Sequence, residues 1–381
     1  MIAFDSPRSE REEEAWLRLI RSENVGPATF FALLSRHGSA EAALDALPDL
    51  VGKGGRTRKI TIAKTDTVRR ELDHGTRDGV HFVFWGGANY PPRLAEIYAP
   101  PPVLTVRGDP KQMLKVPLAI VGARKASAAG RNLASEFAAA FGEAGHPVVS
   151  GLALGIDAAS HKAALTTGTI GVVAGGVDKP TPLENVPLAE EIVDAGGAIV
   201  SEMPLGYHPV ARDYPRRNRL IAGLSQAVLV VEAAAQSGSL HTARYALDAN
   251  RDLFAVPGSP RDPRAAGCLA LLRDGAGFAA EPLDVLSALP KQTHGDPAEI
   301  GFSEAQSRRP VETPMPLMGT TDELLDEVAD LLSMTPVFVD EIVRATGWAP
   351  AVINAALLEL ELAGRAERDV DGSVRRAIEE G

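Results

Sequence analysis

Cationic side chains gather at two places where a short apolar run gives way to a segment of helical character. Arg124 and Lys125 lie in VGARKASAAG, and Arg216, Arg217 and Arg219 lie in DYPRRNRLIAGLS. Guanidinium groups bind phosphate through paired hydrogen bonds, and a helix start adds free backbone N–H donors. Both segments are therefore candidate phosphate-binding sites.

Neutral donors accompany these cations. Ser150 and Gly151 follow the apolar run PVV, Asn218 lies between two arginines, and Ser237 and Gly238 lie in QSGSLHTA. Hydroxyl and amide groups at a helix start bind anions, although helix capping alone could explain Ser237. Several separate anion receptors suit a strand of phosphates.

Both cationic segments also have simpler interpretations. Arg124 could pair with a nearby carboxylate such as Asp157, and the second cluster could be a solvated surface patch. Three arginines at one helix start nevertheless favour a polyanion as the partner.

Few residues could carry catalysis. Asp157 and His161 lie one helical turn apart, but a helix cap and a buried histidine explain them better than an acid–base pair. Cys268 is the only cysteine, and the chain has no HExxH, Walker A or cysteine–histidine metal pattern. We expect no catalytic residue, no metal and no enzyme activity.

The segment GARKAS is where a dinucleotide cofactor would bind. Gly122 fits the first glycine of GxGxxG, but Arg124 and Ser127 replace the second and third. Without those glycines the backbone has no close approach to a pyrophosphate, so we expect no cofactor.

Six short apolar runs would bring the candidate residues together. They are PLAIVG, PVVSG, TIGVVAGG, AIVSE, AVLVVEA and LFAVPG, and stretches of helical character separate them. This alternation predicts an α/β fold, a Rossmann-like parallel sheet with helices on both faces. Because parallel strands end at one edge, the loops that carry the candidate residues should meet there.

The pattern also divides the chain. We expect an N-terminal helical, SAM-like domain over 10–75, the Rossmann-like domain over 78–288, a linker over 289–320 and a winged-helix-like domain over 321–378. The turn NVGP resembles a helix-hairpin-helix turn only weakly. The basic segment 52–59 could contact phosphate, but a solvated loop is the favoured interpretation.

Charge is distributed unevenly. The whole chain carries a formal charge of −11, yet residues 110–284 hold 16 lysines and arginines against 17 aspartates and glutamates. A near-neutral centre leaves room for a local basic site. The acidic N-terminus, the single cysteine and the lack of an apolar run of about 18 residues predict a cytoplasmic protein with no membrane partner.

The motifs together resemble a known family. VGARKASAAG, VSGLALGIDAASH, RRNRLIAGLS, VVEAAAQSGSLHTA, AVPGSP and LLRDGA are similar to successive motifs of the DNA-processing protein A (DprA) family, in its order and spacing, over about Tyr90 to Ala276. The resemblance implies a homodimer that binds single-stranded DNA and loads the RecA recombinase during natural transformation. It implies phosphate binding by Gly122, Arg124, Ser150, Gly151, Arg217, Asn218, Arg219, Ser237 and Gly238, with Lys162 as a further candidate.

Two positions depart from the family pattern. Thr181 precedes Pro182 where the family usually has tyrosine, which leaves an aromatic contact there in doubt. Cys268 and Leu269 stand where an asparagine often follows the late glycine.

The C-terminal segment lacks the charge pattern of a domain that binds duplex DNA. Its candidate recognition helix, PAVINAALLELELAG, has no lysine or arginine before Arg365 and carries Glu359 and Glu361, which would repel phosphate. We expect this domain to bind protein rather than duplex DNA.

Three functions are compatible with these features. The favoured one is a non-enzymatic mediator that binds single-stranded DNA. The others are a nucleotide-binding or nucleotide-hydrolysing enzyme of a related Rossmann-like fold, whose PGGxGT stretch is missing here, and a sensor that holds one nucleotide.

Overall fold

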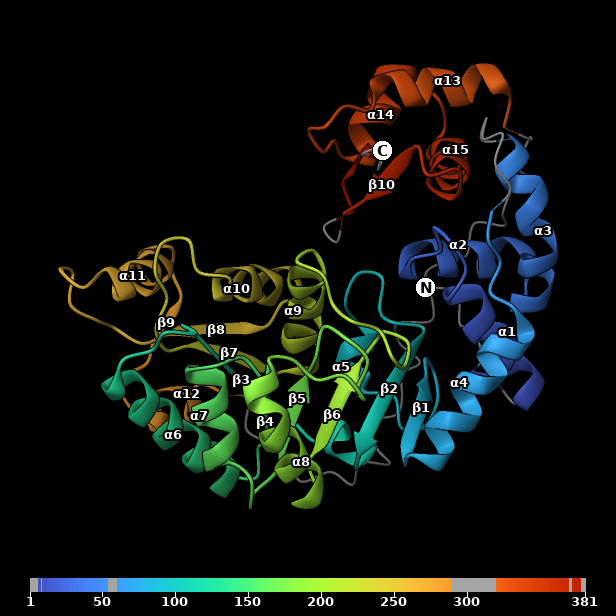
Figure 1. Ribbon diagram of the computed structural model, residues 1–381. Coiled ribbons are helices and arrows are strands. Elements are labelled where there is room, and N and C mark those ends of the chain that lie inside the picture. Colours follow the sequence, from blue (N-terminus) through green and yellow to red (C-terminus); the bar gives the residue numbers. More distant parts are fainter. Residues whose placement is uncertain (1–5, 8, 54–59, 290–319, 370–371, 378–381) are drawn as a thin grey trace.

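The computed structural model describes residues 6–7, 9–53, 60–289, 320–369 and 372–377 (Figure 1). Helices at the N-terminus flank a large sheet domain, and a small C-terminal domain lies next to those helices (Figure 1). Nearly all of the expected linker, and residues 54–59 of the expected basic segment, lie outside the described residues. No helix in the described part of the chain is long and apolar enough to cross a bilayer.

A nine-stranded sheet forms the centre of the molecule, in the order β1-β2-β6-β5-β4-β3-β7-β8-β9. Neighbouring strands from β6 to β9 pair in parallel, whereas β1 and β2 add an antiparallel edge. The expected Rossmann-like parallel sheet is therefore confirmed, with two antiparallel strands at one end. The strands are β1 (Val80–Phe84), β2 (Val103–Gly108), β3 (Leu118–Val121), β4 (Val148–Ser150), β5 (Thr169–Val172), β6 (Ala198–Ser201), β7 (Ala227–Val230), β8 (Asp252–Ala255) and β9 (Gly277–Phe278).

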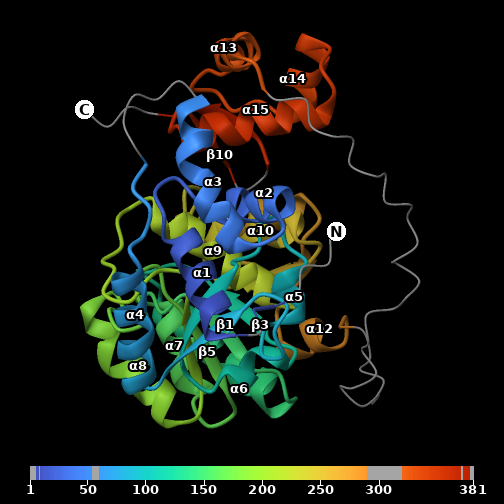
Figure 2. The ribbon, with the colours of Figure 1, turned by 90° about the vertical axis from the view of Figure 1, so that its right-hand side faces the viewer.

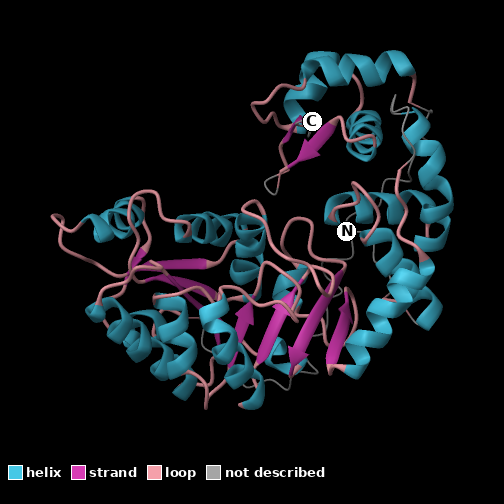
Figure 3. Cartoon of the chain, viewed as in Figure 1, coloured by secondary structure: helices cyan, strands magenta, loops and turns pink. Residues whose placement is uncertain are grey.

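Helices cover both faces of the sheet (Figures 1 and 3). One face carries α6 (Ala128–Glu143), α7 (Ile156–Ala163), α8 (Val186–Asp194) and α12 (Pro282–Leu286). The other carries α5 (Pro92–Ala95), α9 (Asp213–Leu224), α10 (Ser239–Asp248) and α11 (Ala266–Arg273). The central strands are almost completely buried, which explains why their sequences are apolar runs without alternation.

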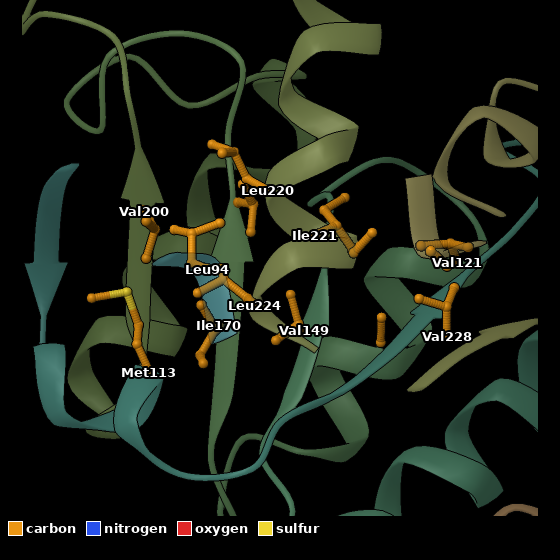
Figure 4. Packing of buried hydrophobic residues seen from close by; sticks show 14 of the residues in the cluster. Leu94, Met113, Val121, Val149, Ile170, Val200, Leu220, Ile221, Leu224 and Val228 are labelled. Atoms are coloured by element: carbon orange, nitrogen blue, oxygen red, sulfur yellow. The ribbon is translucent and has the colours of Figure 1, made fainter. Parts of the chain in front are cut away.

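Helix α9 is held on the sheet by its apolar face. Leu220, Ile221 and Leu224 are at most 2% exposed and pack among strand residues that include Val149 and Val228 (Figure 4). Burying each of these side chains contributes about 1.5–3 kcal/mol. This packing fixes the start of α9 at the carboxyl edge of the sheet.

The N-terminal helices pack against the antiparallel end of the sheet. They are α1 (Glu10–Ile20), α2 (Pro27–His37), α3 (Ala40–Lys53) and α4 (Thr65–Arg77). The ring of Trp16 meets Phe30 of α2 and Phe84 of β1 edge-on, at centroid distances of 5.0 and 6.3 Å. One core therefore joins this helical domain to the sheet.

The C-terminal domain has three helices and a hairpin, as expected for a winged helix. The helices are α13 (Asp322–Leu331), α14 (Val339–Thr346) and α15 (Pro350–Leu362), and the antiparallel strands β10 (Ala366–Arg368) and β11 (Val374–Arg376) form the wing. Leu358 and Leu362 of α15 belong to the core of the N-terminal domain, so α15 packs on α2 and α3 (Figure 2).

Candidate functional site

The chain changes direction between β3 and β7. These strands are parallel neighbours, but β3 continues through α6 to β4 on one side while β7 continues through α10 to β8 on the other. Loops that diverge in this way leave a crevice at the carboxyl edge, where open α/β sheets bind ligands. We call the surface formed by residues 122–127, 151–155, 213–218 and 231–238 the rim.

Arg124 and Lys125 are exposed cations on the rim. The guanidinium carbon of Arg124 lies 5.5 Å from the centre of the Tyr214 ring, whose hydroxyl is 3.3 Å from the hydroxyl of Thr181. In the part of the chain that the structure describes, neither cation pairs with a carboxylate. Stacking on an aromatic ring orients a guanidinium group while leaving its N–H donors available.

Asp157 does not neutralise Arg124, so that simpler interpretation is wrong. The carboxylate instead accepts hydrogen bonds from the backbone N–H groups of Gly151, at 3.1 Å, and Ala153, at 3.2 Å. Burial raises its pKa, and the positive charge of Arg217 opposes that rise. Asp157 therefore shapes the loop after β4.

Arg217 belongs to the rim segment 213–218, but its side chain is buried beneath the rim surface. Its guanidinium donates to the carbonyl oxygens of Gly151 and Val172, at the ends of β4 and β5. Burial, and to a lesser degree the charge of Arg124, lowers its pKa to about 10, so it stays charged at neutral pH. The expectation that Arg217 is an open phosphate receptor is therefore corrected: its hydrogen bonds hold two rim loops together.

Ser150 and Gly151 belong to the same buried floor. The Ser150 hydroxyl donates to the carbonyl of Ile120 at 2.6 Å and is completely buried. A Cβ at position 151 would lie 2.7 Å from an Arg217 nitrogen, so a larger residue there would have to displace the guanidinium group. Both residues support the rim from below and do not present donors to solvent.

Arg219 is engaged inside the protein. It forms an ion pair with Glu202 and donates to the carbonyl of Ala99 at 3.1 Å, and its side chain is only 8% exposed. It also lines a cavity of about 30 Å³ with Tyr98 and Tyr245. The expectation that Arg219 binds phosphate on the rim is therefore corrected, because this cation is already paired.

Arg216 and Lys162 are both exposed, but only one of them is on the rim. Arg216 points outward from the first turns of α9 and pairs with Glu367 of the wing at 2.9 Å. Lys162 lies at the last turn of α7, next to His161, which contacts Thr169 at the start of β5. It is therefore at the opposite end of the helix from the rim.

The loop after β7 is tied to α9. The Asn218 amide donates to the carbonyl of Gly238 at 3.2 Å, and the hydroxyls of Ser237 and Ser239 are 2.7 Å apart. Nothing lies within 4 Å of a Cβ built on Gly238, so this position is open to solvent. These donors reach the rim surface beside the exposed cations.

A carboxylate of the chain occupies the start of α6. Glu232, directly after β7, accepts hydrogen bonds from the backbone N–H of Ser127, at 2.9 Å, and from the Ser127 hydroxyl. A Cβ on Gly130 would lie 2.5 Å from this carboxylate, and one on Gly122 would lie 2.7 Å from Ile156. The glycines therefore permit internal packing, and a pyrophosphate would have to displace Glu232.

His161 is not placed for catalysis. It is completely buried, and its Nδ1 contacts the hydroxyl of Thr169 at 2.7 Å. Burial, followed by the charge of Arg217, lowers its pKa to about 3. The structure agrees with a neutral core histidine.

Two rim residues were not anticipated from the sequence. Tyr214 had a signal, since it lies next to the arginine cluster in DYPRRN. Glu232 ends an apolar run, but its role depends on β7 lying beside β3, which the sequence does not state.

The acidic residues of α15 are covered by the N-terminal domain. Glu361 accepts from the Thr29 hydroxyl at 3.0 Å, and Glu359 pairs with Arg36 at 3.4 Å. The helix expected to meet an external partner therefore meets another part of its own chain. Its acidic residues match the charge and hydrogen-bond donors of α2.

Comparison with known families gives three matches along the chain. Residues 81–290 match the family described as DNA recombination-mediator protein A. Residues 10–73 match the DprA-like N-terminal HHH domain, and residues 312–372 match the DprA winged helix domain.

Individual proteins agree with these matches. Protein Smf of Escherichia coli strain K12 is 39% identical over 279 residues, 72% of this chain and 72% of that protein. The X-ray structure of DNA processing protein A from Streptococcus pneumoniae has a TM-score of 0.61 at 28% identity and covers 74% of this chain and 99% of its own. The Helicobacter pylori structure, solved to describe a single-stranded DNA binding mode, has a TM-score of 0.51 at 27% identity and covers 55% and 94%.

Proposed function

Since the chain belongs to the DNA recombination-mediator protein A family, we propose that it binds single-stranded DNA along the rim. The family is one of mediators and not of enzymes. The Helicobacter pylori relative binds single-stranded DNA. The observation that carries the proposal is the pair Arg124 and Lys125, two exposed cations without carboxylate partners in the described chain, at the switch point of the sheet.

The division of labour on the rim follows from burial. Arg124, Lys125 and Arg216 supply charge to phosphates, while Asn218, Ser237 and Gly238 supply neutral donors or open backbone beside them. The buried residues beneath them keep the loops in register. Contacts of this kind are made to the phosphate backbone of the DNA. The affinity should therefore depend little on base sequence and fall steeply as the salt concentration rises.

The proposal extends to the steps after DNA binding. We propose that a homodimer in the cytoplasm protects incoming strands and loads a RecA-type recombinase onto them during natural transformation. The description of the family as a recombination mediator supports this extension. Size-exclusion chromatography with a recombinase tests this extension. The chain and the recombinase should elute together when single-stranded DNA is present and separately when it is absent.

A nucleotide-binding or nucleotide-hydrolysing enzyme is the alternative, but the site geometry disfavours it. Glu232 fills the helix start that would receive a pyrophosphate, and both Asp157 and His161 are buried. Incubation with nucleoside monophosphates should release no base. A mononucleotide at high excess should also fail to displace a bound oligonucleotide.

Fluorescence anisotropy with a labelled oligo-dT tests the proposed function. We expect Arg124→Ala to weaken binding about tenfold, because a charge-assisted contact is lost. The plot of log affinity against log salt should become shallower by about 0.7, the value for one phosphate on a single strand. Arg77→Ala is the matched control, since Arg77 is exposed at the end of α4. Equal titrations for the two variants would refute the assignment.

A further inference from the structure

The wing of the C-terminal domain reaches back to the rim (Figure 1). Glu367 of β10 accepts a hydrogen bond from Arg216 at 2.9 Å, and both side chains remain partly exposed, at 34% and 47%. Arg216 is one of the three exposed rim cations that the proposed function assigns to phosphate. One rim cation is therefore held by a carboxylate from another domain.

A second contact lies beside the first. Burial lowers the pKa of Arg368, the next residue of the wing, but Glu361 and Tyr98 together raise it, so Tyr98 lies near this side chain. A Cβ built on Gly372 would lie 3.6 Å from the Tyr98 ring, so the chain just before β11 passes the same side chain. Tyr98 follows α5 and lines the small cavity with Arg219. The wing thus rests on the central domain at two neighbouring points.

The wing is also anchored from behind. Glu361 of α15 bonds Arg368 at 2.7 Å with one carboxylate oxygen and accepts from Thr29 at 3.0 Å with the other. A continuous path of contacts therefore runs from α2, through α15 and the wing, to Tyr98 in the central domain. The contacts of Glu361 in α15 are buried, whereas the Arg216–Glu367 ion pair is open to water. This ion pair is the weakest of the contacts, because ion pairs in water are easily exchanged.

We propose that Glu367 competes with DNA phosphate for Arg216, so that the wing covers one end of the rim until a DNA strand displaces it. A carboxylate and a phosphate accept the same paired hydrogen bonds from a guanidinium group, which makes the exchange chemically direct. This inference rests on the proposed function, since it needs the rim to bind DNA. The wing then lowers the affinity for DNA without preventing binding, because it holds only one of the three exposed rim cations.

Glu367→Gln in the full-length protein tests the competition. Glutamine keeps the size of the side chain but removes the charge that Glu367 shares between Arg216 and Arg375 of β11. We expect oligo-dT to bind about two- to fivefold more tightly, which corresponds to the loss of the exposed ion pair between Glu367 and Arg216. The salt dependence should steepen by up to about 0.7, because a further phosphate contact forms without competition.

Glu341→Gln is the matched control. Glu341 is exposed in the first turn of α14, so this variant removes the same charge from the same domain without touching the wing. Affinity should stay within experimental error of the wild type. If Glu367→Gln and Glu341→Gln behave alike while Arg124→Ala still weakens binding, the competition is refuted and the proposed function stands. If Arg124→Ala has no effect either, both fail.

A double-mutant cycle separates local competition from a general charge effect. In the Arg216→Ala background, Glu367→Gln should lose its effect on affinity, because the contested cation is gone. An effect that persists there would overturn the inference.

Tyr98→Phe provides an independent variant on the other side of the contact. It removes a hydroxyl group that lies against the wing and leaves every charge in place. Affinity should rise, by less than in Glu367→Gln, and a weaker or unchanged affinity would count against a wing that covers the rim.

Discussion

The loop after β3 and the first turns of α9 carry the same kind of side chain on the same rim, but the protein uses them differently. Arg124 and Lys125 are exposed and lack carboxylate partners in the described chain, whereas Arg217 and Arg219 are less than one-tenth exposed and donate to protein acceptors. Successive helix residues point in different directions, so only Arg216 of the α9 cluster faces outward. The number of arginines on a binding edge therefore overstates the charge that a ligand can reach.

The largest expected difference is in stability. Arg217→Met leaves two backbone carbonyls without their charged donor and removes the positive charge near buried Asp157. We expect a loss of about 4 kcal/mol in the free energy of unfolding. Arg124→Met, the matched exposed change, should alter it by less than about 0.5 kcal/mol. Urea titrations followed by circular dichroism measure both, and similar values would erase the contrast between the two regions.

Arg219→Met should be the next most costly change. It leaves Glu202 without its partner in a mostly buried position, which we expect to cost about 3 kcal/mol. Replacing both residues, as Arg219→Met with Glu202→Met, should recover part of that loss because no unpaired charge remains. A double variant less stable than the single one would show that the pair does more than neutralise itself. The same titration gives the answer.

The buried charge of Arg217 should also be visible in the pH dependence. The pKa of His161 is lowered to about 3 by burial and then by Arg217, while an unfolded chain has a histidine pKa of about 6.5. At pH values above about 6.5, His161 is neutral in both the folded and the unfolded chain, and its contribution to stability is complete. As pH falls to 5, the unfolded chain binds a proton that the native one refuses, and stability drops by about 2 kcal/mol.

His161→Gln should therefore flatten the loss of stability between pH 7 and pH 5, measured by urea titration at each pH. His208→Gln is the control, because His208 is exposed. A slope that is the same in both variants would show that His161 titrates in the native protein.

The smallest expected effect is on DNA affinity, where it separates the exposed rim lysine from a lysine away from the rim. Lys125→Ala should weaken oligo-dT binding about threefold at low salt, with the difference shrinking as salt rises. Lys162→Ala should leave the affinity unchanged, since this lysine lies at the far end of α7. Anisotropy titrations compare the two directly. Equal losses would mean that the DNA path leaves the rim.

Much of the architecture could be predicted from the sequence. Short apolar runs separated by helical segments specify a parallel sheet, and parallel strands must end at one edge. The orientation of the α9 arginines was also partly encoded: Arg217 lies four residues before Ile221 and therefore on the buried side of the helix.

Other features have no local signal. The role of Glu232 requires β7 to lie beside β3, an adjacency of strands more than a hundred residues apart. Likewise, Glu359 and Glu361 look like surface acids until α2 is packed against them. Contacts between distant segments decide both cases, and periodicity within a segment carries no information about them.

Glu232 has a consequence for the protein inside a cell. Free nucleotides are abundant there. They would occupy an open helix start at the carboxyl edge of a Rossmann-like sheet, and the occupied site could no longer bind a polymer. Because Glu232 is part of the chain, it cannot diffuse away, and its carboxylate accepts the hydrogen bonds of Ser127 at this helix start. What is left for solvent is a spread of separate weak contacts that only a long, repeating polyanion can engage all at once.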